Sequence, residues 1–477
     1  MNSEHELFHA ALVSCAYLLV FAAAELWRIF GNPPREHTRK FVHFASGAIC
    51  LSFSYIFASH WTVLVLCFSF TLVMIVTKRT GLLKSVHDVD RKTSGGMYYP
   101  LAVYITFFVA YRFNLPHYYL IAILILAVSD SMAAIIGKRY GFKVYRVEED
   151  NKSLEGSVIF FFVTFLIVLL GLLLLSPLSR AHCIVLAVYL SLLVTAFESI
   201  SLGGADNIFI PLGAMAVLIK SDGKSVAHIG IHILILIVIS LCIYILISRT
   251  RKLGISAIIG IALLGYAASA LVAPHWVFPV LLGTLLFSFV NVFLEEPARD
   301  TDMRRIRPVF YILVVSLIWI FIGNFFREFS FLVYTGYVTN ITANLSILWS
   351  RKSRLIHEGR CSPIPGPLCH APLIVRIVVL CGLLVPPTAL LDPDISTLFS
   401  LVVTIVGMVI IEGVYRVIER KQKGKWRDIQ FLQCTALISM IVTLIQLVVS
   451  QYFYRSALSL SPVSLLYYII DTVSRTG

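Results

Sequence analysis

Asp130 follows a long apolar run, and a second polar block, NKSLEGS at 151–157, comes soon after it. Polar groups cost free energy inside a bilayer, so an ionisable residue in or beside an apolar segment indicates a functional site. With the block around Asp130 (SDSMAAIIGKRYG, 129–141), five such blocks lie in the first half of the chain. The other three are RKFVHFASG (39–47), HDVDRKTSGGMYYPLA (87–102) and FESISLGGADNIFIPL (197–212).

These blocks contain the groups that a nucleotide triphosphate and its metal require. Cations neutralise phosphates, carboxylates hold a hard metal such as Mg²⁺ through oxygen, and glycines let backbone N–H groups approach phosphate oxygens. The cations are Arg91, Lys138, Arg139 and Lys152, the carboxylates are Asp130, Glu155, Glu198 and Asp206, and the glycines are Gly95, Gly96, Gly137, Gly141 and Gly156. Gly156 and Ser157 also lie where a helix is expected to begin, and a helix N-terminus favours anions.

Several common sites are excluded by the sequence. The chain has no GxxxxGK[ST] phosphate loop and no HRD or DFG signature, so a soluble-kinase fold is excluded. The 9 cysteines form no CxxC pair, which argues against a zinc site or a disulfide framework.

The elements that position these blocks must be membrane helices. The chain has 477 residues, of which 58% are hydrophobic and 14% charged. Apolar runs of about 20 residues, each long enough to cross roughly 30 Å of hydrocarbon, recur from end to end. Helices satisfy their backbone groups within lipid, so we expect an all-α, polytopic transmembrane bundle of roughly 14–16 membrane helices.

The expected spans fall in two sets. In the first half they are 8–30, 42–58, 61–77, 97–113, 118–137, 156–176, 183–200, 208–219 and 226–248. In the second half they are 254–272, 276–294, 308–326, 329–348, 373–391, 396–418 and 429–453. The segment 208–219 is short, so it either spans or re-enters. We predict a first transmembrane domain over 1–250 that carries the five blocks, and an additional transmembrane domain of unassigned function over 251–477.

The net charge of +13 does not indicate a nucleic-acid partner here, because the cations cluster on one side of the expected spans. In the first half that side holds Arg35, Arg39, Lys40, Lys78, Arg79, Lys84, Arg91, Lys92, Lys138, Arg139, Lys143, Arg146 and Lys152. The positive-inside rule makes this face cytoplasmic. All five blocks open onto it, which predicts a single site between helix ends on the cytoplasmic face of an integral membrane protein. The sequence does not indicate which membrane, and it predicts no particular protein partner.

The order of the blocks resembles a known family. SDxxAxxxGxxxG, KSLEGS and ESxxxxxxDNxxxPL, in that order, are similar to the CTP-dependent polyprenol kinases, which include dolichol kinase, phytol kinase and yeast-type diacylglycerol kinase. Part of the pattern is shared with phosphatidate cytidylyltransferases. The resemblance covers roughly residues 36–220. The chain departs from it at Ser129, where many members have glycine, and in the acidic insertion 145–150.

The resemblance implies transfer of the CTP γ-phosphate to the hydroxyl of a membrane-embedded, isoprenoid alcohol, with Mg²⁺. The implied catalytic residues are Asp130, Lys152 and Glu155. The implied metal ligands are Asp130, Glu155 and Asp206. Nucleotide contacts are assigned to Arg91, Lys138, Arg139, Lys152, Ser153 and Gly156. Substrate contacts are assigned to His43, Glu198 and Asn207. The expected partners are therefore CTP, the lipid alcohol and membrane lipids.

Plainer interpretations stay open for several of these residues. Asp130 and the Asp206–Asn207 pair could cap helices, and Lys138 and Arg139 could be topology anchors. His43 could be a buried, hydrogen-bonded histidine, and the Arg91 segment an ordinary loop.

Two rival functions also remain. One is CTP-dependent cytidylyl transfer onto a lipid phosphate. The other is a membrane transporter, although the two halves show none of the repeat symmetry common in transporters. In the second half, polar residues such as Asn340, Asn344 and Glu412 are scattered along the sequence and predict no activity.

Overall fold

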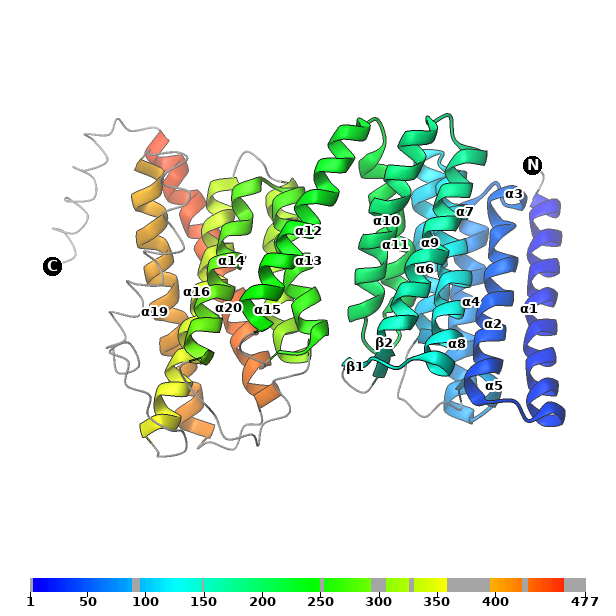
Figure 1. Cartoon of the computed structure of the whole chain (residues 1–477), viewed down its shortest axis with the longest axis horizontal. Helices are drawn as coiled ribbons and strands as arrows, with labels where there is room; N and C mark the ends of the chain where they lie inside the picture. The colour runs from blue at the N-terminus through cyan, green and yellow to red at the C-terminus, as the bar shows by residue number, and fades with distance from the viewer. Residues whose placement is uncertain are drawn as a thin grey trace. The chain divides into compact units, whose positions relative to one another are not determined.

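The computed structural model describes residues 3–87, 95–147, 150–248, 253–292, 306–325, 330–357, 395–422 and 428–458. These residues are almost entirely helical, and the strands among them are the two of one short hairpin, so the predicted all-α class is confirmed (Figure 1). The chain forms two compact units, 1–235 and 236–477. The division falls within α12 (Val226–Ser248), whereas the boundary expected from the sequence follows that helix.

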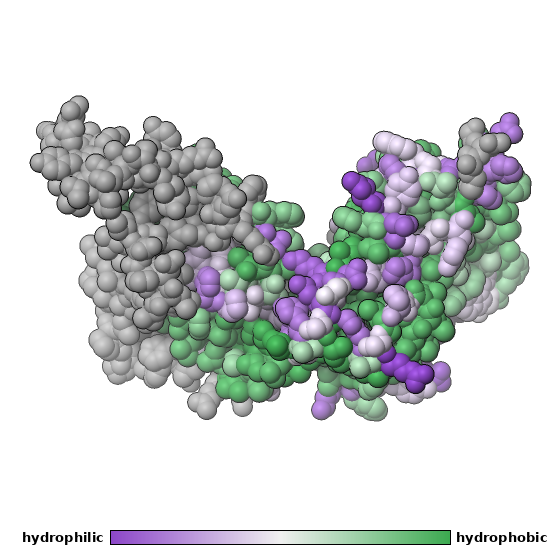
Figure 2. All heavy atoms as spheres, turned by 90° about the horizontal axis from the view of Figure 1, so that it is seen from above, coloured by the Kyte–Doolittle hydropathy of each residue, from purple (hydrophilic) through white to green (hydrophobic). Residues whose placement is uncertain are grey.

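The helices have the length and composition of membrane spans. Seven described helices can cross a bilayer, and three apolar helices are shorter. The seven are Glu4–Gly31, His60–Thr80, Pro116–Tyr140, Leu154–Leu175, Arg180–Ile200, Val226–Ser248 and Gln433–Ser450. Broad areas of exposed hydrophobic residues accompany them (Figure 2). The chain is therefore a multi-pass membrane protein, because an aqueous surface of this kind would associate.

The first unit contains all five polar blocks. Its elements up to the hairpin are α1 (Ser3–Gly31), α2 (Arg35–Leu51), α3 (Phe53–Ile56), α4 (His60–Thr80), α5 (Lys84–His87), α6 (Gly95–Phe113), α7 (Pro116–Leu124), η1 (Ile125–Ser129) and α8 (Asp130–Tyr140). They are followed by β1 (Val144–Val147), β2 (Asp150–Ser153), α9 (Leu154–Leu175), α10 (Arg180–Ile200), α11 (Asp206–Ser221) and the first part of α12. The short expected span 208–219 is thus part of one continuous helix, α11, with Pro211 inside it.

Asp130 lies inside a continuous helix and not at its end. The segments α7, η1 and α8 run without a break from Pro116 to Tyr140, and η1 is one turn of π-helix that ends immediately before Asp130. A π-turn displaces backbone carbonyls from the regular α-helical pattern, and such turns often mark functional sites. Asp130 is 6% exposed and caps nothing, so the helix-cap interpretation is wrong.

The block NKSLEGS forms the junction between strand β2 and helix α9. Strands β1 and β2 pair antiparallel, with Tyr145 opposite Lys152, and the second strand leads directly into α9. Ser153 is the N-cap of α9, and its Oγ accepts a hydrogen bond from the Gly156 N–H at 3.1 Å. The sequence signal for a helix start at this block is confirmed. The hairpin, by its register, carries Lys152 toward the end of α10.

Glycines bring α8 and α9 into close contact. A Cβ on Gly137 would lie 2.9 Å from Ser153 Oγ and 3.1 Å from the Gly156 Cα. A Cβ on Gly156 would lie 3.1 Å from the Ala133 carbonyl oxygen. These glycines therefore serve helix packing, as small residues commonly do between membrane helices.

A second close contact joins α2 to η1. A Cβ on Gly47 would overlap the Ala127 Cβ and lie 3.3 Å from the Tyr99 hydroxyl oxygen. Because Gly47 lies in the same helix as Lys40 and His43, this contact sets how near those side chains come to Asp130.

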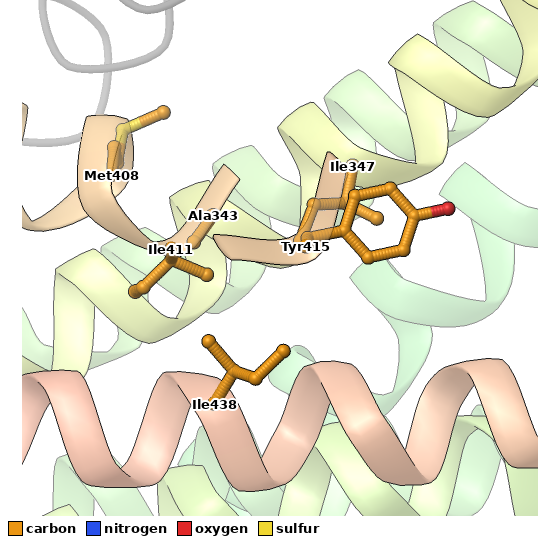
Figure 3. Packing of buried hydrophobic residues seen from close by; sticks show 6 residues of the cluster. All are labelled: Ala343, Ile347, Met408, Ile411, Tyr415 and Ile438. Atoms are coloured by element: carbon orange, nitrogen blue, oxygen red, sulfur yellow. The ribbon is translucent and has the colours of Figure 1, made fainter. Parts of the chain in front are cut away.

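The second unit consists of helices around its own core. They are the remainder of α12, then α13 (Ile255–Leu271), η2 (Pro274–Val277), α14 (Phe278–Val292), α15 (Ile306–Phe325), α16 (Ser330–His357), α19 (Ile395–Gln422) and α20 (Asp428–Leu458). Six buried residues from α16, α19 and α20 form an apolar cluster (Figure 3). They are Ala343, Ile347, Met408, Ile411, Tyr415 and Ile438.

Polar side chains in this unit are grouped, although their sequence positions are scattered. Asn340 donates to Ser316 Oγ at 2.9 Å and accepts from Ser439 Oγ at 2.6 Å, which joins α15, α16 and α20. The fully buried Glu412 accepts from Ser346 Oγ at 2.6 Å and from Arg416 at 2.7 Å. The Asn340 contacts and the Ser346–Glu412 contact join different helices, as polar pairs commonly do in membrane proteins, whereas Arg416 lies on the same helix as Glu412.

We expect Gly47→Ala to destabilise the first unit by about 1–3 kcal/mol, because the added methyl group meets a side chain on a packed helix. Thermal unfolding of the detergent-purified protein measures this loss. The matched control is Gly230→Ala in α12, where an added Cβ meets nothing within 4 Å. Since both changes raise helix propensity equally, equal melting temperatures for the two variants would show that α2 and η1 are not in tight contact.

Candidate active site

The centre of the site is a buried ion pair between two helices. Lys40 Nζ in α2 lies 2.6 Å from Asp130 Oδ2, and the two side chains are 6% and 9% exposed. The same ammonium group also approaches the Asp130 backbone carbonyl at 3.4 Å. So deeply buried a carboxylate is stable because its cation and its hydrogen bonds compensate for the loss of hydration.

His43 lies one helical turn beyond Lys40 and contacts the same carboxylate. Its Nε2 is 3.2 Å from Asp130 Oδ2 and 2.9 Å from the Leu126 carbonyl oxygen in the π-turn. Its ring packs edge-on against Tyr99, with centroids 4.9 Å apart. His43 is thus largely buried and hydrogen-bonded, close to the plainer interpretation, and it also lies beside the Asp130 carboxylate.

Sequence reasoning selected His43 but missed Lys40, which it counted only among the charges that set topology. The available signal was spacing: residues three apart on a helix lie on one face. Lys40 and His43 have that spacing inside the block 39–47. The departure at Ser129 also has a structural role, because Ser129 Oγ accepts from Thr164 Oγ1 at 3.0 Å and ties η1 to α9.

A second, largely buried ion pair links the hairpin to α10. Lys152 Nζ lies 2.6 Å from Glu198 Oε1, donates to the Glu198 backbone carbonyl, and approaches Ser201 Oγ at 3.4 Å. Burial lowers the pKa of Lys152, but the carboxylates of Glu198 and Asp206 outweigh it and hold the pKa above its usual value. Lys152 therefore stays charged at neutral pH.

Three carboxylates from three helices surround these cations. Asp130 and Asp206 both act electrostatically on Glu198, so α8, α10 and α11 bring negative charge to one region. Asp206 is the first residue of α11, and its Oδ1 accepts from the Asn207 N–H at 3.0 Å. Oxygen donors of this kind suit Mg²⁺.

Within the described residues, no three or more His, Cys, Asp or Glu side chains are arranged to hold a metal by themselves. Mg²⁺ on a nucleotide needs only one or two carboxylates, since phosphate oxygens and water complete its shell. The donor set therefore fits a metal that arrives with phosphates.

Other predicted residues have different local partners. The Glu155 carboxylate accepts hydrogen bonds from the Lys143 N–H at 3.2 and 3.3 Å, so it links the first turn of α9 to the residue before β1. The Gly156 N–H is already bonded to Ser153 Oγ, which itself approaches the Gly137 carbonyl at 3.3 Å.

Of the remaining predicted residues, Lys138, Arg139 and Asn207 lie at the edges of the site. Lys138 and Arg139 are exposed at the end of α8, where Arg139 lies over the Tyr140 ring at 5.3 Å. Asn207 is buried and donates to the Gly95 carbonyl at 2.8 Å, which joins α11 to α6. Arg91 lies outside the described residues.

A pocket of about 950 Å³ adjoins the first ion pair. Its walls come from α1, α2, α3, α4, α5, α6 and the start of α11. His43 is part of the wall, so the side chain that touches Asp130 also faces the pocket. An apolar pocket with a few convergent polar groups is the usual form of a small-molecule site.

The chain is similar to one named enzyme. It is 28% identical to phytol kinase from Synechocystis sp. (strain ATCC 27184 / PCC 6803 / Kazusa) over 214 residues, which are 44% of this chain and 91% of that protein. No family model matches the chain. No solved structure matches it. The similarity agrees, at the level of the family, with the resemblance seen in the five polar blocks.

We expect Lys40→Met to lower the free energy of unfolding by about 3–5 kcal/mol, because the Asp130 carboxylate would stay buried without its cation. The double variant Lys40→Met/Asp130→Leu should recover most of that loss, since it removes both charges. Thermal unfolding in detergent measures both variants.

Lys143→Met is the control for the Lys40 variant, because Lys143 is an exposed lysine of the same unit. If Lys40→Met unfolded at the same temperature as Lys143→Met, or if the double variant recovered nothing, the pair would not be a structural interaction.

Proposed function

We propose that this protein is a CTP-dependent kinase that transfers the γ-phosphate to the hydroxyl of a lipophilic, isoprenoid alcohol at the cytoplasmic face of a membrane. The observation that supports it most is the position of His43, which contacts the buried Asp130 carboxylate and lines a largely apolar pocket. Similarity to a phytol kinase adds support for a kinase of lipid alcohols. The motifs that resemble the CTP-dependent family lie in the unit that holds this site.

The proposed reaction needs one proton acceptor beside the alcohol. The alcohol oxygen forms a new bond to the γ-phosphorus, the bond from that phosphorus to the β–γ bridging oxygen breaks, and CDP leaves. The hydroxyl proton passes to the Asp130 carboxylate, which Lys40 and His43 hold in one orientation. Positioning and charge neutralisation supply most of the catalysis in phosphoryl transfer.

Cations at the helix ends contact the triphosphate. Lys152 exchanges a contact with Glu198 for one with a phosphate oxygen, while the exposed Lys138 and Arg139 bind from the end of α8. A charged lysine or arginine beside a transferring phosphoryl group stabilises the transition state.

Mg²⁺, when bound, neutralises phosphate charge, and Asp206 and Glu198 are the residues that fit it best. Their oxygens lie near Lys152, whereas the Glu155 carboxylate is engaged by the Lys143 amide. We therefore place Glu155 in a positioning role for the hairpin that carries Lys152.

The experiment uses detergent-purified full-length protein, Mg²⁺ and γ-labelled CTP, with a panel of lipid alcohols. We expect label in an organic-phase lipid phosphate. Asp130→Asn should lower kcat by about 10²–10⁴-fold, the usual effect of removing a general base. The matched control is Asp222→Asn, an exposed aspartate at the end of α11, which should keep full activity.

Other outcomes assign other functions. Label from α-labelled CTP in a lipid, given a lipid phosphate acceptor, would identify cytidylyl transfer instead. Uptake into proteoliposomes without nucleotide turnover would identify a transporter. Equal activities of Asp130→Asn and Asp222→Asn, with both proteins folded, would remove Asp130 from the mechanism.

A further inference from the structure

Two histidines lie side by side at the start of α12. His228 and His232 are four residues apart, so both side chains project from one face of the helix. Their Nε2 atoms are 3.2 Å apart, and their ring centroids are 4.8 Å apart. Because His228 is exposed and His232 is only half-buried, an ion in water can reach both nitrogens. Two histidines with this spacing on a helix supply ligands in zinc sites.

The distance between the two nitrogens suits a shared metal ion. Zn²⁺ binds imidazole nitrogen at about 2.0–2.1 Å, so two such ligands at the tetrahedral angle lie about 3.3–3.4 Å apart. The observed 3.2 Å is only slightly shorter than that separation. A hydrogen bond from one neutral ring to the other also fits this length, and metal titration distinguishes the two cases.

The backbone that carries the pair is held in place by its own turn. Gly223, with a φ of +68°, lies in the tight turn between α11 and α12. Ser225 follows it, and its Oγ accepts a hydrogen bond from the His228 N–H at 3.2 Å. The Tyr189 ring of α10 lies beside the His232 ring, with centroids 6.1 Å apart. Both ligand-bearing turns are therefore fixed by neighbouring groups, as a preorganised site requires.

The chemistry of the pair selects the class of ion. Imidazole nitrogen suits zinc, copper and nickel, whereas Mg²⁺ and Ca²⁺ prefer oxygen ligands. Within the described residues, no third His, Cys, Asp or Glu joins the two histidines. A bound ion would therefore keep water in its other coordination positions and exchange with solution. Lys224 acts electrostatically on His232 and repels a cation, so the affinity depends on both nitrogens binding together.

We infer that His228 and His232 form a binding site for a transition-metal ion of the zinc class, at the end of the first unit that lies opposite Asp206. Helix α11 runs from Asp206 to Ser221, and its 16 residues span about 24 Å before α12 begins. The metal site is thus separate from the candidate active site and does not rest on the proposed function. The ion links two successive turns of α12, the helix within which the two units divide, and stiffens its first part.

The first test counts bound zinc on the detergent-purified full chain, prepared without a polyhistidine tag, by competition with a fluorescent zinc indicator. Since the chain has 13 histidines and 9 cysteines, each value is compared with that of a variant. We expect His232→Ala to bind one zinc ion fewer per chain than the native protein. An unchanged number of bound ions would overturn the inference.

A relocated histidine provides the matched control. The double variant Gly230→His/His232→Ala keeps the number of histidines but places the second ring two residues from His228, where the two rings do not face each other. An added Cβ at Gly230 meets nothing within 4 Å, so the helix accommodates the change. This variant should also bind one zinc ion fewer. Native zinc binding by the relocated variant would show that histidine content, and not the paired geometry, holds the ion.

Hydrogen exchange tests the effect on the helix. At a free zinc concentration about ten times the dissociation constant, exchange through local opening of the first two turns of α12 should slow about tenfold. Mg²⁺ at the same concentration should not slow it, and zinc should not slow it in the relocated variant. Equal slowing by zinc in the native and relocated proteins would contradict a link between His228 and His232.

Copper identifies the ligands directly. Cu²⁺ also prefers imidazole, and at one ion per chain its electron paramagnetic resonance spectrum should show coupling to two imidazole nitrogens in the native protein. His232→Ala should reduce this to one nitrogen. A spectrum that His232→Ala leaves unchanged would place the ion elsewhere and overturn the assignment.

Discussion

The site depends on a carboxylate that is buried within a membrane helix. Asp130 is tolerated there because Lys40 reaches it from α2 and His43 shares the same oxygen. Both partners come from one helix face, so the register of α2 against the π-turn fixes the whole arrangement. That register is set by the contact of Gly47 with Ala127, where no larger residue fits. The contact between Gly47 and Ala127 thus determines whether the Lys40–Asp130 ion pair can form.

The sequence predicted the parts of this structure that composition and local pattern determine. Hydrophobic runs predicted the membrane helices, and a helix start was expected at Gly156 and Ser157, close to the observed start of α9 at Leu154. The same local reasoning could not find Lys40 as a partner of Asp130, because 90 residues separate them and only the packing of α2 on η1 joins them. Local sequence patterns could not predict the pocket either, since its walls come from seven separate elements.

The glycines show that the role of a residue follows from its position in the fold more than from the motif that contains it. Gly137, Gly141 and Gly156 were interpreted as residues that let backbone N–H groups approach phosphates. In the structure they let α8 pack against the start of α9, and the Gly156 N–H is already bonded to Ser153. The polar residues Asn340 and Glu412 illustrate the converse, because each is paired within the second unit although the sequence shows no pattern.

Charge balance explains why the proposed reaction requires more than the two buried lysines. Lys40 and Lys152 are each neutralised by a carboxylate at 2.6 Å, so neither brings net positive charge to an arriving nucleotide. A triphosphate carries several negative charges, and Asp130, Glu198 and Asp206 add more. In the proposed reaction, the exposed cations at the end of α8 would compensate part of this charge, although single ion pairs in water are weak. Under the proposed function, a divalent metal held by Glu198 and Asp206 would compensate the rest of this charge.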